Sequence, residues 1–425
     1  MAKGPDRPII NHLTDIDFYK FSMGQFIWQY ASRVIIALGF RNRTEGIRLA
    51  HLIDEGELRE QLEHARDLQF TSSELHYLGG TFEYGTRMFS EEYINFLKTM
   101  RLPDFHLERD GNGYRLEFEG LWDSVTYWET LALSIVTELY GRACLEGLGR
   151  FERDRAIAES RLRLGTKLDL LRRYPHTTFS DFGTRRRFSF DHQDYIVGVL
   201  TEVMQHQSFN QFIGTSNVWL ANKYGVMPMG TSAHELFMVF ASLGKPNTDE
   251  DTDEAIRASQ LQVLKLWWEL YGQGLSIALT DTYGTPWFFR NVPREVAVDW
   301  KGTRQDSMDP YHYGELAIQF YKKHCVFPQD KFIVFSDGLE APVIVKLAQH
   351  FCGRIKTTFG WGTNLTNDVP GCRPLSLIIK PIRVNGKGTV KLSDNIAKAT
   401  GTPEDIERFV RIFEYHNSYN KKCTY

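Results

Sequence analysis

Between residues 175 and 365 the sequence repeats one pattern, in which a short apolar segment ends in a cluster of small or polar residues. Seven segments follow it: HTTFSDFGTRRR, QFIGTSN, GVMPMGTSAHE, LSIALTDTYGT, EVAVDWKGTRQDS, KFIVFSDG and RIKTTFGWGTN. Several precede helical sequences such as IRASQLQVLKLWWELYG. Alternating strand and helix is typical of parallel strands, whose carboxyl ends lie together. In a closed α/β barrel this end carries the active site, so the pattern predicts where functional residues gather.

The segments on either side of this region predict a second unit. VIIALGF and YRLEFEG are expected strands within residues 1–145, and residues 151–174 form a charged amphipathic helix. LSLIIKPIRV at 375–384 is a further expected strand, and a helix begins after Thr402. The predicted class is α/β: an irregular seven-stranded α/β barrel over residues 150–369. An α+β sandwich lobe is built from residues 1–145 and completed by residues 370–425, which pack back on it.

Charge and composition exclude several partners. The net charge of −3 over 425 residues argues against a general electrostatic grip on nucleic acid, so an anionic ligand must be bound by local clusters. The five cysteines are scattered without a CxxC pair, which suggests neither a disulfide framework nor a zinc site. MAKGPDRPII lacks the apolar core of a signal peptide, and no segment approaches the ~18–20 apolar residues of a membrane span. We expect a soluble, cytoplasmic protein that binds no membrane.

The sequence MGTSAHELFM at 229–238 places one imidazole at an expected helix start. Thr231 or Ser232 is a candidate N-cap, and Glu235 has capping-box spacing from Ser232. Taken alone, His234 reads as an ordinary early helical residue. The alternative is a functional imidazole at a helix N-terminus, where free N–H groups stabilise an anion.

Two glycine-containing clusters follow expected strands. In FGWGTN, Gly360 and Gly362 allow backbone N–H groups to point at an anion, and Thr363 adds a donor, although a plain turn explains the same residues. In SDG, Asp337 beside Gly338 either accepts from ribose hydroxyls or caps the next helix.

Charged residues end two other expected strands. In DWKGTRQDS, Arg304 can bind a phosphate or pyrophosphate, and Asp306 a sugar hydroxyl or Mg²⁺; a surface ion pair is the alternative. Asp281, which ends LSIALTD, is either an N-cap or a ligand group.

Aromatic and basic residues suggest a site for a flat anion. In FSDFGTRRR, Phe182 offers a stacking face, and the arginines at 185–187 are either anion receptors or an exposed charge run. In TDIDFYKFSM, Tyr19 offers a second aromatic face or serves only in packing.

Together these motifs resemble one family. The motifs DFYK, DFGTRR, GTSN, GTSAHE, TDT, GTRQDS, SDG, FGWGTN and VKLSD occur in order over nearly the whole chain, and this pattern resembles the bacterial type of nicotinate phosphoribosyltransferase, a type II phosphoribosyltransferase. The resemblance implies that nicotinate and phosphoribosyl pyrophosphate (PRPP) form nicotinate mononucleotide and pyrophosphate. It also implies ATP hydrolysis through phosphorylation of His234, and Mg²⁺ bound with PRPP and ATP.

The resemblance also implies a role for each candidate residue. Catalytic roles fall to His234, Asp281 and Asp306; nicotinate binding to Tyr19, Phe182, Arg185 and Ser216; and PRPP or phosphate binding to Arg304, Ser307, Asp337, Gly338, Gly360, Gly362 and Thr363. Tyr19 would enter the site of the partner subunit in a homodimer. Relatives that use nicotinamide carry an aspartate where this chain has Ser216, so a serine there favours the acid over the amide.

Other readings compete with this one. A nicotinamide or quinolinate phosphoribosyltransferase would share the chemistry, and a non-catalytic sensor of NAD precursors would keep only the pocket. A barrel aldolase would need a Schiff-base lysine at a strand end, for which Lys301 and Lys380 are the candidates.

Overall fold

The computed structural model describes residues 7–83, 85–206, 209–244 and 252–416. The expectations placed on residues 1–6 and on Cys423 lie outside these ranges. Within them the chain forms two main sheets, whose buried hydrophobic residues belong to one continuous cluster.

The larger sheet has six strands that pair in parallel. Their order across the sheet is β7 (Phe212–Thr215), β6 (Thr178–Asp181), β11 (Lys356–Trp361), β10 (Phe332–Phe335), β9 (Gly302–Gln305) and β8 (Ile277–Leu279). Five of the six were expected from the repeated pattern. In EVAVDWKGTRQDS the apolar residues instead form a helix over Arg294–Asp299, and the strand β9 lies in the polar cluster that follows. Because the strands are parallel, the polar residues that follow them lie at the same edge of the sheet.

The seventh expected strand, in the segment GVMPMGTSAHE at residues 225–235, does not form. It contributes a single parallel bridge between Thr215 and Pro228, beside β7. Pro228 has no N–H to give to a ladder, and Gly230 has φ +157° where its Cα passes the backbone of Tyr19. Among the described residues, the parallel sheet therefore has six strands rather than the expected seven. Its two edge strands are β7 and β8.

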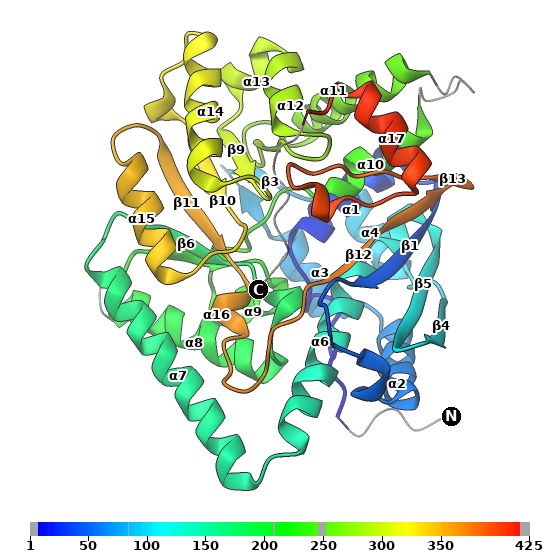
Figure 1. The fold of residues 1–425 in the computed structure, drawn as a ribbon, viewed down its shortest axis with the longest axis vertical. Coiled ribbons are helices and arrows are strands. Elements are labelled where there is room, and N and C mark those ends of the chain that lie inside the picture. Colours follow the sequence, from blue (N-terminus) through cyan, green and yellow to red (C-terminus); the bar gives the residue numbers. More distant parts are fainter. Residues whose placement is uncertain (1–6, 84, 207–208, 245–251, 417–425) are drawn as a thin grey trace.

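The second sheet joins strands from distant parts of the chain. Its antiparallel order is β13 (Lys387–Gly388), β12 (Leu377–Val384), β1 (Ile35–Asn42), β5 (Gly113–Leu121) and β4 (Phe105–Asp110). Figure 1 shows β12, in orange, beside the blue β1. A hairpin of β2 (Phe82–Glu83) and β3 (Thr86–Arg87) stands apart.

Helices pack around the parallel sheet, whereas β4 and β5 of the antiparallel sheet alternate buried and exposed residues and lie at the outer edge of the molecule (Figure 1). The helices that precede β6 are α1 (Tyr19–Ala31), α2 (Glu55–Asp67), α3 (Ser72–Gly79), α4 (Glu91–Thr99), α5 (Trp122–Val125), α6 (Trp128–Glu146) and α7 (Arg150–Arg172). The later ones are α8 (Phe190–His206), α9 (Val218–Tyr224), α10 (His234–Leu243), α11 (Asp253–Tyr271), α12 (Thr285–Asn291), α13 (Arg294–Asp299), α14 (Pro310–Lys323), α15 (Ala341–Phe351), α16 (Thr363–Thr366) and α17 (Pro403–Ile412). Short 3₁₀ helices lie at Leu49–His51, Thr184–Arg186, Pro328–Asp330 and Ile396–Lys398.

The last helix begins as expected but packs elsewhere. Thr402 caps α17 by accepting from the N–H of Asp405, and Pro403 is its first residue. The helix packs on α11, and the ring of Phe413 just beyond it stacks on Tyr283 with centroids 4.1 Å apart. Whereas β12 pairs with β1, this helix instead covers the elements next to β8.

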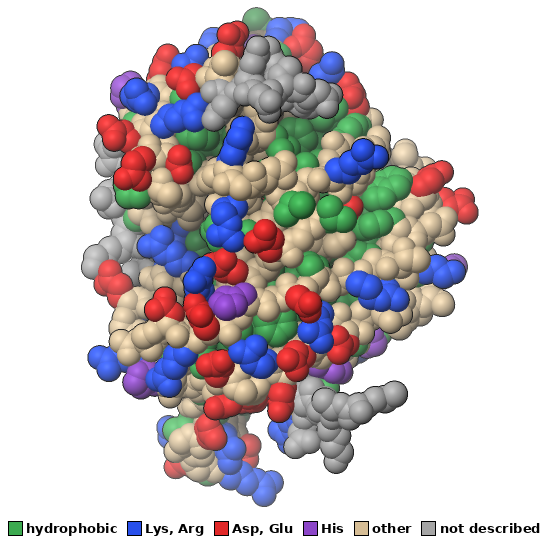
Figure 2. Space-filling view, turned by 90° about the vertical axis from the view of Figure 1, so that its right-hand side faces the viewer, with side chains coloured by type: hydrophobic (Ala, Val, Ile, Leu, Met, Phe, Trp, Pro, Cys, Tyr) green, Lys and Arg blue, Asp and Glu red, His purple; other side chains and the backbone are tan. Residues whose placement is uncertain are grey.

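The surface carries charges of both signs. Figure 2 shows acidic and basic side chains intermingled on the face drawn there, next to a group of hydrophobic side chains. Among the described residues, no helix combines the length and the apolar character needed to cross a membrane.

Candidate active site

A cavity of about 890 Å³ lies at the carboxyl ends of the parallel strands. It reaches across to α1, to the amino-terminal part of α6 and to β12. The predicted residues that line it are Tyr19, Phe182, Arg185, Ser216, His234, Arg304, Asp306, Asp337, Gly338, Gly360, Gly362 and Thr363. Asp281 and Ser307 lie behind this lining. The structure thus brings the predicted residues to one place.

His234 is the first residue of α10 and is almost fully buried. Its Nδ1 lies 3.0 Å from the hydroxyl of Thr282, and its Nε2 lies 3.0 Å from a carboxylate oxygen of Asp306. Burial, with the charge of Lys391, lowers the pKa of His234 to about 4 against the opposing charge of Asp281. The imidazole is therefore neutral near pH 7. Since a carboxylate only accepts hydrogen bonds, Nε2 carries the proton and Nδ1 the lone pair.

The expected capping box at this helix is wrong. The N-cap is Ala233, which makes no side-chain cap, and the carbonyl of Ser232 accepts from Arg304 instead. Glu235 is buried and points away from His234, accepting from Trp122 at 2.8 Å and from Thr126 at 2.6 Å. A buried carboxylate needs such partners, and they outweigh a local cap. Asp306, not Glu235, contacts the imidazole.

Asp281 and Asp306 form a pair of carboxylates beside His234. One Asp281 oxygen accepts from the hydroxyl of Ser307, while the other is buried without a hydrogen bond among the described residues and lies 3.7 Å from Nε2 of His234. Burial raises the pKa of Asp306, but the hydrogen bond from His234 and the charge of Arg304 hold it well below the ordinary value. Ligand atoms of His234 and both aspartates lie within 4.8 Å of one another. Two carboxylates with an unused oxygen fit a hard divalent cation such as Mg²⁺.

An aromatic and arginine-lined corner occupies the other end of the cavity. Arg185 donates to the hydroxyl of Tyr19 at 2.8 Å and lies 3.6 Å from a carboxylate oxygen of Asp17. The hydroxyl of Ser216 donates to the other oxygen of Asp17 at 2.5 Å. Burial raises the pKa of Asp17 despite these partners. Tyr19 lines the cavity of its own chain.

Glycine at two positions sets the shape of this corner. A Cβ on Gly360 would lie 2.3 Å from the ring of Phe182, so the ring rests directly on the backbone of β11. Gly362 is the N-cap of the short α16, and its Cβ would lie 3.2 Å from the carbonyl of Phe182. The hydroxyl of Thr363 is buried without a hydrogen-bond partner among the described residues. Gly360 therefore positions an aromatic ring, which the reading of FGWGTN as an anion loop did not foresee.

The remaining predicted residues lie on the wall nearest β9 and β10. Arg304 and Asp306 have different partners, so the surface ion pair considered from the sequence is excluded: Arg304 donates to Ser232, and Asp306 contacts His234. Asp337 pairs with Lys398 at 2.7 Å. It does not cap the following helix, because Glu340 is the N-cap of α15.

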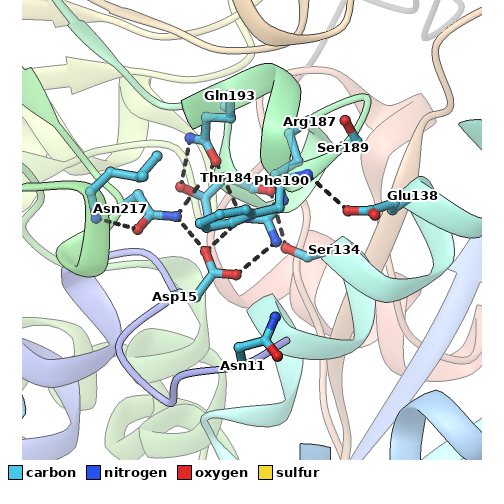
Figure 3. Close-up of polar contacts among 12 residues, drawn as sticks. Asn11, Asp15, Ser134, Glu138, Thr184, Arg187, Ser189, Phe190, Gln193 and Asn217 are labelled. Atoms are coloured by element: carbon cyan, nitrogen blue, oxygen red, sulfur yellow. Dashed lines mark hydrogen bonds and ion pairs between the residues drawn. The ribbon is translucent and has the colours of Figure 1, made fainter. Parts of the chain in front are cut away.

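The three arginines at 185–187 occupy two different environments. Arg185 and Arg186 line the cavity, whereas Arg187 is fully buried and pairs with both oxygens of Asp15 at 2.5 and 2.7 Å. Figure 3 shows this pair with Gln193, which accepts from Arg187 and donates to Thr184. The network holds the short helix that carries Arg185.

Several cavity residues were not predicted from the sequence. Glu129 pairs with Lys20 and with Lys380, each at 2.6 Å, and these charges hold its pKa well below the ordinary value although burial raises it. Burial lowers the pKa of Lys391 to about 8, while Asp281 and Asp306 oppose the shift. Lys380 and Lys391 lie in the segment after the parallel sheet. Lys391 belongs to the motif VKLSD, which could have indicated it, whereas no quoted motif contains Lys380.

The aldolase interpretation has no support in the geometry. Lys301 precedes β9, at the opposite end of the strand from the cavity, and donates to the carbonyl of Gly274. Lys380 belongs to β12 in the antiparallel sheet and pairs with Glu129.

Parallel strands that end at a cavity lined by basic, aromatic and carboxylate side chains are typical of α/β enzymes. The nicotinate phosphoribosyltransferase (NAPRTase) family profile matches residues 177–417, and the profile of the NAPRTase N-terminal domain matches residues 14–137. The chain belongs to the nicotinate phosphoribosyltransferase family and is an enzyme of this kind.

Solved structures of similar proteins agree in fold. The nicotinate phosphoribosyltransferase of Porphyromonas gingivalis is 30% identical, with a TM-score of 0.80; the alignment covers 96% of this chain and 100% of that one. The nicotinate phosphoribosyltransferase of Vibrio cholerae is 27% identical, with a TM-score of 0.84, over 97% of this chain and 95% of that one.

Proposed function

We propose that this enzyme transfers the phosphoribosyl group of PRPP to the ring nitrogen of nicotinate, releasing pyrophosphate, and that ATP drives the reaction through a phosphorylated His234. The observation that carries the proposal is the gathering of Arg185, Tyr19, Phe182, Arg304, Asp306 and His234 around one cavity. A flat acid and a polyphosphate are the two ligands that such a lining suits.

The aromatic corner is the proposed site for nicotinate. Tyr19 and Phe182 supply faces for the pyridine ring, and Arg185 supplies a cation for the carboxylate. Arg185 already interacts with Tyr19 and Asp17, so its guanidinium is held in place before substrate arrives. A preorganised arginine loses less side-chain freedom on binding.

The opposite wall is the proposed site for PRPP. Positive charge develops on the ribose as the bond to pyrophosphate breaks, and the carboxylates of Asp281 and Asp306 stabilise that charge. Arg304, Thr363 and the backbone at Gly338 and Gly362 are donors for the phosphate groups. Mg²⁺ held by Asp281 and Asp306 would neutralise part of the charge on the leaving pyrophosphate.

The neutral imidazole of His234 is the proposed phosphoryl acceptor. The lone pair on Nδ1 leaves its hydrogen bond with Thr282 and forms the N–P bond while the bond from the γ-phosphorus to ADP breaks, and the proton stays on Nε2, which faces Asp306. Later hydrolysis returns the imidazole and inorganic phosphate. The cation of Lys391 lies where it can compensate the phosphoryl charge.

The homodimer implied by the resemblance stays a prediction. The entry of Tyr19 into the partner's site stays a prediction with it; within one chain Tyr19 lines the cavity.

An assay with three pyridines tests the reaction. Purified protein with PRPP, Mg²⁺ and ATP is given nicotinate, nicotinamide or quinolinate, and the mononucleotide is measured by chromatography. We expect product from nicotinate far in excess of the other two. Preference for nicotinamide or quinolinate, or binding of nicotinate without turnover, contradicts the proposal.

Labelling with γ-³²P ATP tests the phosphohistidine. Wild-type protein should acquire an acid-labile label that His234→Asn lacks, and His350→Asn should retain it because His350 lies on the surface beside Glu315. Label that persists in His234→Asn would exclude His234 as the acceptor.

A further inference from the structure

Two cysteines far apart in the sequence meet beside the cavity. Cys144 lies near the end of α6, and Cys372 lies in the segment between α16 and β12. Their Sγ atoms are 2.6 Å apart, although 228 positions separate them in the chain. Both are free thiols in this structure.

The segment that carries Cys372 forms one wall of the cavity. All eight residues from 367 to 374, here called the wall segment, line it. The orange chain after α16 follows this path in Figure 1. At its start Asp368 pairs with Arg163 and Lys167 of α7, each at 2.7 Å. Beyond its end the N–H of Ser376 donates to Thr44. Cys372 therefore sits between two anchored points in one wall of the cavity.

We propose that Cys144 and Cys372 form an oxidation site, at which a hydroperoxide converts the two thiols into a disulfide that ties the wall segment to α6. The Cys144 thiolate attacks the peroxide, so that an S–O bond forms and the O–O bond breaks. The Cys372 sulfur then displaces the oxygen, which leaves as water. In sum, two thiols lose two electrons and two protons, and one hydrogen peroxide becomes two waters.

The surroundings of the two sulfurs indicate which one reacts with the peroxide and which one completes the disulfide. The hydrogen bond from Cys372, opposed by burial, lowers the pKa of Cys144 to about 7, whereas the same bond and burial raise that of Cys372. Cys144 is thus a thiolate in a substantial fraction of chains at neutral pH, and it is partly exposed. Cys372 is buried against it and can resolve the oxidised sulfur.

The disulfide has a consequence for the cavity. Because α6 carries Glu129 and Leu133 into the same cavity, a covalent tie between α6 and the wall segment restrains two of its walls against each other. Entry and release of a ligand as large as PRPP then become slower. This effect on turnover rests on the proposed function, whereas formation of the bond does not.

Peptide mapping of the full chain tests the bond. Reduced protein is treated with hydrogen peroxide, free thiols are alkylated, and the digest is analysed by mass spectrometry. We expect a linked peptide pair containing Cys144 and Cys372 that disappears on reduction. The linked pair should form in Cys352→Ser, whose replaced thiol is exposed elsewhere, and not in Cys144→Ser. Absence of the pair in oxidised wild-type protein overturns the proposal.

Enzyme kinetics test whether the disulfide slows turnover. Oxidation should lower kcat/KM for PRPP several-fold in wild type and in Cys352→Ser, reductant should restore it, and Cys144→Ser should resist the loss. An equal loss in Cys144→Ser would assign the effect to another group and overturn the link to the cavity. If the linked pair forms in protein that makes no nicotinate mononucleotide even when reduced, the proposed function fails while the oxidation site stands.

Discussion

At the scale of single residues, we expect the choice between acid and amide to depend on Ser216. Its hydroxyl donates to Asp17, so the position already adjoins one carboxylate. Ser216→Asp would put a second carboxylate against the first and near the bound acid, and like charges at that distance repel strongly. We expect kcat/KM for nicotinate to fall by about 10- to 100-fold. The neutral Ser216→Asn is the matched control, and unchanged nicotinate kinetics in Ser216→Asp would refute this role.

Lys391 should set the alkaline limit of activity. Burial lowers its pKa to about 8, so its charge is present below that pH and is lost above it. At pH 9 about a tenth of the chains keep the charge. If the cation stabilises phosphoryl groups, kcat/KM measured against pH should fall above about pH 8. Lys391→Arg should move this fall upward, because arginine stays charged, and an identical profile in both proteins would contradict the assignment.

Residues near an ordered motif could be predicted from the sequence, and those brought in from elsewhere could not. Arg304 and Asp306 lie at the end of β9, and a parallel sheet gathers such positions at one edge. His234 belongs to an ordered motif that reaches the same cavity although the strand expected before it is absent. Glu129 and Lys380 carry no such signal, because their meeting depends on how β12 enters the other sheet. The contact of Cys144 with Cys372 could not be predicted from local spacing either, because 228 positions separate them.

At the scale of elements, the segment after β6 depends on one buried ion pair. Arg187 is fully buried, and Asp15 is its partner through two hydrogen bonds (Figure 3). Removing one member leaves the other charge unpaired, which costs about 3–5 kcal/mol. Arg187→Gln should therefore lower the free energy of unfolding by about that amount and weaken nicotinate binding through Arg185.

A surface pair provides the matched control for this change. Arg66 pairs with Asp67 and Asp104 in a more exposed setting, and Arg66→Gln should cost about 1 kcal/mol or less. Denaturant unfolding measures both variants. Equal midpoints for the two would show that the buried pair does not hold this element.

The local sequence pattern predicts where some helices are capped and fails for others. Thr402 and Pro403 predict the start of α17 correctly, because a cap is a local hydrogen bond. The capping box expected for α10 does not form, because Glu235 binds Lys20 of α1 and Trp122 of α5 rather than a backbone N–H. Tertiary burial overrides local propensity where a charge must be satisfied.

At the scale of the whole molecule, the carboxyl-terminal segment completes both the sheet and the cavity. β12 pairs with the edge of β1, whose Ile36 and Leu38 are fully buried. It also brings Lys380 to Glu129. A chain that ends at residue 369 would expose that edge and leave Glu129 with one partner fewer. We expect it to aggregate or to lack native circular dichroism. A monodisperse truncated chain that melts like the full one would contradict this.

The position of β12 between β13 and β1 also orders events during synthesis. The ribosome makes β1 more than three hundred residues before its neighbour, since the strands span Ile35–Asn42 and Leu377–Val384. During that interval the nascent chain holds an incomplete sheet whose free edge is open to chaperones. Lys380 and Lys391 both line the cavity, so we expect the cavity to be complete only after residues 380 and 391 have left the exit tunnel.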